Sequence, residues 1–246
     1  MIRQLPKTQC HDADDSNCGQ AQLILLLISH ILDFSFQDSV YLWKRERKEH
    51  TTTMAGKKSF LPEQVLDKAI DLFWKQGYEG TSIEDLVQCM GLGRGSLYDT
   101  FGDKHALYLA ALSRYLAKYQ GPVVELQQQT GPLSEILERF FHACIELLLS
   151  DPACRGCFLV NATVEMAPHD PEVNQIVQSA LQEIEEGFYR LLIKAQVAGD
   201  LSWTQDPHQL AHFLSGTLVS IRVLARAKLG RRVLQDVVKT ALAVFH

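Results

Sequence analysis

Residues 81–104 read TSIEDLVQCMGLGRGSLYDTFGDK, and they predict two short helices joined at a glycine. Apolar residues recur at helical spacing in the first half, at Ile83, Leu86, Val87 and Met90. Thr81 and Ser82 are candidate N-caps, and Asp85 follows Ser82 at the spacing of a capping box. Gly91 supplies the left-handed backbone conformation with which many helices end. One face of the first helix is therefore expected to be buried.

The second helix is predicted from Arg94 to Phe101, directly after Gly93. Leu97 and Phe101 share one side of it because they are four residues apart. We expect the polar residues to project outward, namely Arg94, Ser96, Tyr98, Asp99 and Thr100. Such a helix fits the major groove of B-DNA, where its first residues reach base edges. The stretch therefore predicts a helix-turn-helix that reads DNA.

From Phe60 to Leu107 the sequence resembles the DNA-binding domain of TetR-family transcriptional regulators. The residues that carry the resemblance are Gly77 and Tyr78 at the end of an apolar helix, Thr81, Ile83 and Leu86, the run GLGRGSLY ending at Tyr98, Phe101 and Lys104. The resemblance implies phosphate contacts by Thr81 and Lys104. With the outward residues of the second helix, the expected DNA-binding set is Thr81, Gly93, Arg94, Gly95, Ser96, Tyr98, Thr100 and Lys104.

Gly93 and the pair Asp99-Thr100 depart from the family pattern. In the family, Ser or Thr is common at the position of Gly93. An aromatic residue followed by His is frequent at the positions of Asp99 and Thr100. Two short helices joined at a glycine also form ordinary corners in all-α proteins, but the combined spacing favours the DNA interpretation. Charge adds little, because residues 54–120 hold eight Lys or Arg and eight Asp or Glu. The whole chain carries −5, which argues against indiscriminate coating of nucleic acid.

The composition predicts a globular protein. The chain has 246 residues, of which 46% are hydrophobic, enough to bury a sizeable core. No apolar run approaches the roughly 18 to 20 residues that span a bilayer, so no membrane partner is expected. Six cysteines in so large a chain fit a reducing compartment, which indicates the cytoplasm.

We predict an all-α fold in three parts. Residues 1–53 form an N-terminal extension of mixed character, disordered or upstream of a translation start at Met54. Residues 54–103 form the helix-turn-helix domain, with three helices. Residues 104–246 form a larger ligand-sensing and dimerisation domain. Its helices are predicted at 104–119, 132–150, 155–167, 171–198, 206–229 and 231–245.

The resemblance also implies a homodimer, in which the last two long helices of each subunit form a four-helix bundle. An apolar face with small residues is available for it at Phe213, Leu214, Ser215, Gly216, Leu218, Ile221 and Leu224. The alternative is that this stripe is the core of a single subunit.

A pocket for a small-molecule inducer is expected among the middle helices. Its candidate residues are Phe141, Cys144, Cys157, Asn161 and Glu165. Asn161 and Glu165 stand out because they are four residues apart on an otherwise apolar helix, where unpaired burial is costly. Each of these residues would serve equally well as plain core.

Cys154 and Cys157 form a CxxC motif with several interpretations. A single pair falls short of a zinc site, and the βαβ surroundings of a thioredoxin-like centre are missing. A thiol-based redox or electrophile sensor remains an alternative, and a CxxC oxidoreductase is a weaker one. No Ser-His-Asp set, phosphate loop or dinucleotide fingerprint is present, so no catalytic residue, metal or cofactor is predicted. We therefore expect a regulator, most simply a repressor that a small molecule releases from operator DNA, and not an enzyme.

Overall fold

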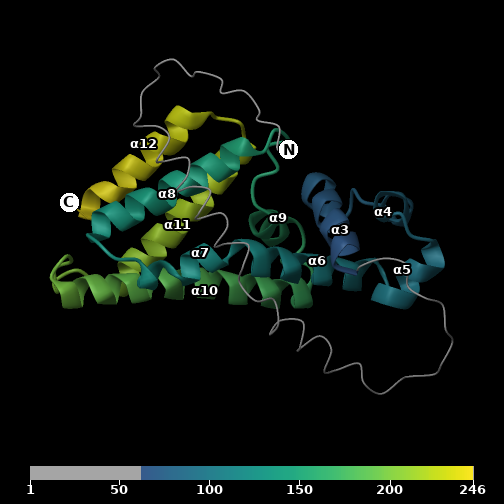
Figure 1. The fold of residues 1–246 in the computed structure, drawn as a ribbon, viewed down its shortest axis with the longest axis horizontal. Helices are drawn as coiled ribbons and strands as arrows, with labels where there is room; N and C mark the ends of the chain where they lie inside the picture. Colours follow the sequence, from purple (N-terminus) through teal and green to yellow (C-terminus); the bar gives the residue numbers. More distant parts are fainter. Residues whose placement is uncertain (1–61, 246) are drawn as a thin grey trace, which may run out of the picture. The chain divides into compact units, whose positions relative to one another are not determined.

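The computed structural model describes residues 62–245, and all regular structure in that range is helical. The expectations for residues 1–53 and for Met54 lie outside the described residues. Figure 1 labels the helices as α3 Pro62–Gln76, α4 Ile83–Met90, α5 Arg94–Phe101, α6 Lys104–Tyr119, α7 Gly121–Val124, α8 Leu133–Ser150, α9 Phe158–Glu165, α10 Pro171–Ala198, α11 Pro207–Arg226 and α12 Arg231–Leu242. Two short 3-10 turns, Leu126–Gln128 and Ala243–Phe245, complete the set. The all-α fold is confirmed.

The turn between α4 and α5 forms as its residues predict. Ser82 is the N-cap of α4, and its hydroxyl accepts the N–H of Asp85 while the Asp85 carboxylate accepts the N–H of Ser82. Gly91 ends the helix with φ +70°, a conformation that costs a glycine little. Leu92 then turns into the core, and Gly93 precedes α5. Local residues therefore fix the geometry of this turn.

Helices α3, α4 and α5 are called the reader helices below. Helix α6 connects them to the rest of the chain (Figure 1). It packs on α3 and α5 and also on α9 and α10. Its bounds match the prediction, with Asp103 as N-cap. A short helix, α7, follows directly after Gln120, and its first turn accommodates Pro122.

The larger part is built on α10, which packs against α11, while α11 and α8 both pack against α12. Two predicted boundaries are wrong, each for a backbone reason. Helix α9 begins at Phe158, because Cys154 and Gly156 have φ of +49° and +71°. Helix α11 ends at Arg226, and Lys228 beyond it has φ +59°. Left-handed residues cannot continue a right-handed helix.

A continuous core runs from the reader helices into the larger part. The Tyr108 ring on α6 makes edge contacts with Phe73 of α3, at 5.1 Å between centroids, and with Phe158 of α9, at 5.5 Å. All three side chains are fully buried. Aromatic packing of this kind adds to the free energy of area burial. No helix among residues 62–245 is long and apolar enough to span a membrane.

Candidate functional site

Helix α5 presents a polar surface on a buried apolar base. Leu97 and Phe101 are buried, whereas Arg94, Ser96 and Tyr98 are exposed. Tyr98 keeps 40% of its surface accessible although it is aromatic. The helix thus offers the mixture of hydrogen-bonding and apolar groups that reads base edges.

The start of α5 is open to an approaching backbone. No side chain caps its first turn, so the first N–H groups have no side-chain acceptor. A Cβ added at Gly93 or Gly95 would meet nothing within 4 Å, so neither glycine is required by packing within the chain. Free N–H groups at a helix start attract phosphate. The two glycines leave room for a DNA strand at this end.

Arg94 is held by two neighbours. Its guanidinium lies 3.1 Å from the carboxylate of Glu84 on α4, and both side chains are largely exposed. The pKa of Arg94 is raised, first by a hydrogen bond with the Tyr98 side chain and then by the charge of Glu84. Exposed pairs of this kind are weak, so Arg94 can exchange Glu84 for a nucleic-acid acceptor at small cost.

Two residues of the expected DNA-binding set are buried. The expectation that Thr100 projects outward is wrong, because it follows Leu97 by three residues and shares its inward side. Thr81 has no accessible surface, and its hydroxyl donates to the carbonyl of Gly77 at 2.6 Å. The Thr81 hydroxyl thus ties the turn before α4 to the end of α3, and Thr100 belongs to the buried side of α5.

Lys104 lies at the start of α6, beyond the last turn of α5. Its Nζ lies 4.1 Å from the centroid of the Tyr78 ring, a cation–π contact. The side chain is only partly buried. This contact fixes the position of one positive charge beside the reader.

A pocket of about 400 Å³ lies where the end of α3 meets α9 and α11. Its lining residues are Gln76, Gly77, Val160, Asn161, Val164, Glu165, Arg222, Val223 and Arg226. Asn161 and Glu165, the polar pair singled out from the sequence, therefore lie on one pocket wall. The Glu165 carboxylate accepts the N–H of Glu79 at 3.1 Å, which links this wall to the turn before α4.

The other three candidate pocket residues lie elsewhere. Phe141 is fully buried and stacks on Phe188. Burial raises the pKa of the Cys144 thiol to about 11. Cys157 is buried, accepts the Tyr115 hydroxyl at 3.5 Å and lines only a separate hollow of about 20 Å³. These residues pack as core and do not line the larger pocket.

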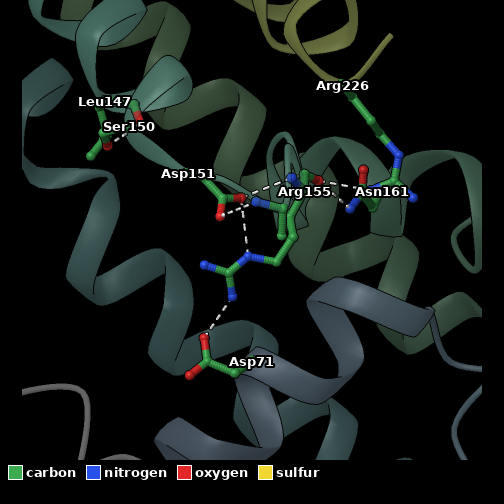
Figure 2. A network of polar contacts seen from close by, with 8 residues as sticks. Asp71, Leu147, Ser150, Asp151, Arg155, Asn161 and Arg226 are labelled. Atoms are coloured by element: carbon green, nitrogen blue, oxygen red, sulfur yellow. Dashed lines mark hydrogen bonds and ion pairs between the residues drawn. The ribbon is translucent and has the colours of Figure 1, made fainter. Parts of the chain in front are cut away.

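Arg155 joins the reader to the rest of the chain (Figure 2). Its Nη1 donates to Asp71 on α3 at 2.7 Å, and its Nε donates to Asp151 at 3.1 Å. Its guanidinium stacks over the Trp74 ring at 4.2 Å. Its backbone carbonyl accepts bonds from Asn161 and Arg226, two of the pocket residues. Arg155 thus connects the pocket to α3, in addition to the Glu165–Glu79 contact.

The expected dimer face is largely internal. Leu214, Leu218 and Ile221 are fully buried within the chain, as the core alternative held. Phe213 and Val223 on α11 remain exposed at 45% and 47%. Residues on α12 and beside it also expose apolar surface, namely Leu229, Val233 and Val244.

Arg155, Arg222 and Glu84 were not predicted as functional residues. Arg222 had one detectable signal, since it is the single charge within the apolar run LVSIRVLA. Arg155 contacts a segment that is distant in sequence, and Glu84 contacts a residue of the next helix. Neither contact can therefore be recognised from helical periodicity.

The exposed second helix, the turn before it and the attached helical part define a helix-turn-helix DNA-binding protein. Residues 65–111 match the model for bacterial regulatory proteins of the tetR family, and residues 133–241 match the tetracyclin repressor-like C-terminal domain. The chain belongs to the TetR family of transcriptional regulators. It is a ligand-responsive, DNA-binding regulator.

Similar proteins cover most of the chain. An uncharacterised HTH-type transcriptional regulator of Bacillus subtilis, YezE, is 33% identical over 192 residues, which are 78% of this chain and 99% of the relative. The transcriptional repressor ComR of Escherichia coli is 28% identical over 76% of this chain and 90% of its own length. The solved structure of a CifR cysteine mutant, a TetR-family regulator complexed with 26-bp operator DNA, has a TM-score of 0.70 at 28% identity, over 76% of this chain and 98% of CifR.

Proposed function

We propose that the protein is a cytoplasmic homodimeric repressor, without catalytic activity, that a small molecule releases from operator DNA. The observation that carries this proposal is the exposed polar face of α5 on its buried Leu97–Phe101 base. The similarity to ComR, a repressor, and to CifR in complex with operator DNA supports it. Residues 54–103 would act as the reader and residues 104–246 as the sensor.

The proposed DNA contacts follow the exposed surface. Arg94, Ser96 and Tyr98 face the bases, with Gly93 and Gly95 admitting the backbone and Lys104 binding a phosphate. Thr81 and Thr100 act from inside by fixing the two helices. The carboxylate of Glu84 must give up Arg94 when DNA binds, since a phosphate or a guanine edge takes its place.

The proposed homodimer uses the apolar surface that α11 and α12 leave exposed. Phe213 and Gly216 are exposed along α11, and Val233 along α12. A stripe of apolar and small residues on two packed helices suits a four-helix bundle. Two readers would then meet half-sites one helical turn, or a multiple of it, apart.

DNA binding is tested by fluorescence anisotropy with the duplex upstream of the chain's own coding region. The full chain is expected to bind it more tightly than a shuffled duplex, with affinity falling as salt rises. Arg94→Ala should weaken specific binding by roughly 10- to 100-fold. Glu84→Gln should strengthen it slightly, because a carboxylate that competes for Arg94 is removed. Equal affinity for both duplexes would contradict the proposal.

Dimerisation is tested by sedimentation of Phe213→Glu. Because a charge on the bundle face opposes association, the variant is expected to sediment as a monomer and to bind the duplex weakly. Val197→Glu is the matched control, since Val197 is exposed at 74% on α10, outside the proposed face. A Phe213→Glu dimer as stable as the parent would rule out this face.

A further inference from the structure

Arg222 is a charged side chain within the apolar part of α11. Its guanidinium is buried, and Nη1 has no hydrogen-bond partner among the described residues. Within residues 62–245 no carboxylate lies within 4.0 Å of it. The ionisable groups that act on its charge are Cys144, Cys157 and Tyr115, whose thiols and hydroxyl offer no counterion when neutral. Because an arginine stays protonated, a full positive charge is buried here without its counterpart.

Arg222 lines the 400 Å³ pocket together with Arg226, one helical turn further along α11. Glu165 of α9 also lines the pocket, and its carboxylate accepts the N–H of Glu79. The charges of the pocket lining therefore sum to +1, from two arginines and one glutamate. The lining also includes the apolar side chains of Val160, Val164 and Val223. The pocket is at the small end of the range for small-molecule sites, about 300–1,000 Å³.

We propose that this pocket binds a small organic monoanion, whose carboxylate is held by Arg222 and Arg226 and whose short apolar body lies on the valines. The inference rests on the proposed function, since it names the chemical class of the inducer. Arginine forks match carboxylate oxygens in a bidentate manner. The single net positive charge favours a carboxylate over a phosphate monoester, which carries about −1.5 to −2.

The same pocket residues connect the ligand to the reader. Arg226 donates its Nη1 to the carbonyl of Arg155 at 2.7 Å, and Arg155 in turn holds Asp71 on α3. A carboxylate in the pocket competes with that carbonyl for the Arg226 guanidinium. Its binding therefore loosens a contact that ties α3 to the sensor. By linkage, a ligand that prefers the loosened state lowers affinity for DNA, and DNA lowers affinity for the ligand.

The test uses the full chain without DNA and three probes of similar size: hexanoate, its neutral isostere hexanamide, and butyl phosphate. Binding is measured by calorimetry. Hexanoate is expected to bind at least about tenfold more tightly than hexanamide, because only hexanoate has a charge-assisted bond to offer. Butyl phosphate should bind more weakly than hexanoate. The proposal is overturned if butyl phosphate binds more tightly than hexanoate or if hexanamide binds as tightly as hexanoate. It is also overturned if hexanoate does not bind up to 50 mM, which is about the weakest affinity that a short monoanion in a fitted site would show.

Three variants separate an anion site from a structural role. Arg222→Gln should lose about tenfold or more in hexanoate affinity while its melting temperature stays equal or rises, because an uncompensated buried charge is removed. Val164→Phe, at an exposed position on the pocket wall, should block hexanoate by filling the pocket. Arg190→Gln, in an exposed pair with Glu186, is the matched control and should bind as the parent does. Unchanged hexanoate affinity in Arg222→Gln would refute the site.

DNA binding is measured separately, so the two proposals fail in different ways. Hexanoate binding without any specific DNA complex would contradict the repressor and leave the anion site standing. Specific DNA binding without hexanoate binding would contradict the anion site and leave the repressor standing. When both hold, hexanoate is expected to weaken the DNA complex in the parent and not in Arg222→Gln.

Discussion

Arg155, in the loop after α8, donates its Nη1 to Asp71 of α3 at 2.7 Å (Figure 2). Its guanidinium carbon lies 4.2 Å from the centroid of the Trp74 ring, also on α3. The Asp151 carboxylate accepts two hydrogen bonds from the same arginine, one from its backbone N–H and one from its Nε–H. Asp71 belongs to the reader, whereas Arg155 and Asp151 belong to the loop between α8 and α9. Arg155 therefore adds a polar contact between the reader and the sensor to the aromatic core that the two parts share.

Replacing Arg155 with Ala is expected to lower the free energy of unfolding by about 1–3 kcal/mol, because its charged hydrogen bonds to Asp71 and Asp151 and its contact with the Trp74 ring are lost. Denaturant unfolding followed by circular dichroism measures this. Arg139→Ala is the control, since within residues 62–245 Arg139 pairs only with Glu135 of its own helix on an exposed face, and should change stability by about 0.5 kcal/mol or less. If Arg155→Ala and Arg139→Ala lower the free energy of unfolding by similar amounts, the Arg155 contacts stabilise the fold no more than an exposed ion pair does.

Gly77 and Gly91 offer a matched pair of substitutions. Both have left-handed backbones, with φ +78° and +70°, so alanine at either costs about 1–2 kcal/mol. At Gly91 the new Cβ meets open space, whereas at Gly77 it would lie 2.6 Å from Oε1 of Glu165. Glu165 must then move and release the N–H of Glu79. Gly77→Ala should therefore cost about 1 kcal/mol more than Gly91→Ala.

That excess is expected to vanish when Glu165 is already Ala, because no carboxylate remains to be displaced. Denaturant unfolding of the four proteins gives the comparison. If the excess persists in the Glu165→Ala background, the cost at Gly77 has a different origin.

The pair Asp67 and Arg114 makes stability depend on pH. Two hydrogen bonds from Arg114, at 2.7 and 2.9 Å, hold the pKa of the Asp67 carboxyl below its ordinary value, although burial opposes the shift. Because the folded-state pKa is the lower one, Asp67 contributes its full stabilisation above the unfolded pKa of about 3.9. That stabilisation is lost as the pH falls through the lowered value.

Asp67→Asn should therefore reduce the free energy of unfolding near neutral pH and flatten its decline between about pH 5 and 3. Urea unfolding across this range measures both effects. An unchanged slope would mean that the Asp67–Arg114 pair is not what links stability to acid.

The cysteines are expected to differ in their reaction with iodoacetamide. Burial raises the pKa of Cys144 to about 11, so at pH 8 almost none of it is thiolate, and Cys157 is buried. Cys154 lies partly exposed in a turn and should be modified before Cys144 and Cys157. Mass spectrometry of digested protein over time gives the order. Faster labelling of Cys157 than of Cys154 in folded protein would revive the thiol-sensor alternative.

Local sequence determined the reader. The capping box of Ser82 and Asp85, the left-handed Gly91 and the inward pair Leu97 and Phe101 are each specified by neighbours within a few residues, and so the helix-turn-helix was predictable from the sequence. The polar pair Asn161 and Glu165 was also recognisable, because two such residues on an apolar helix call for partners.

Tertiary structure decided everything that joins distant segments. It placed Leu214, Leu218 and Ile221 inside the subunit, leaving Phe213 and Val223 outside. It also brought Arg222 to a pocket between three helices, beside the contacts that hold the reader. Helical periodicity specifies which residues share a face, but only the packing of helices specifies what that face meets. Charges such as Arg155 and Arg222 therefore acquire their partners, or remain without them, only in the folded chain.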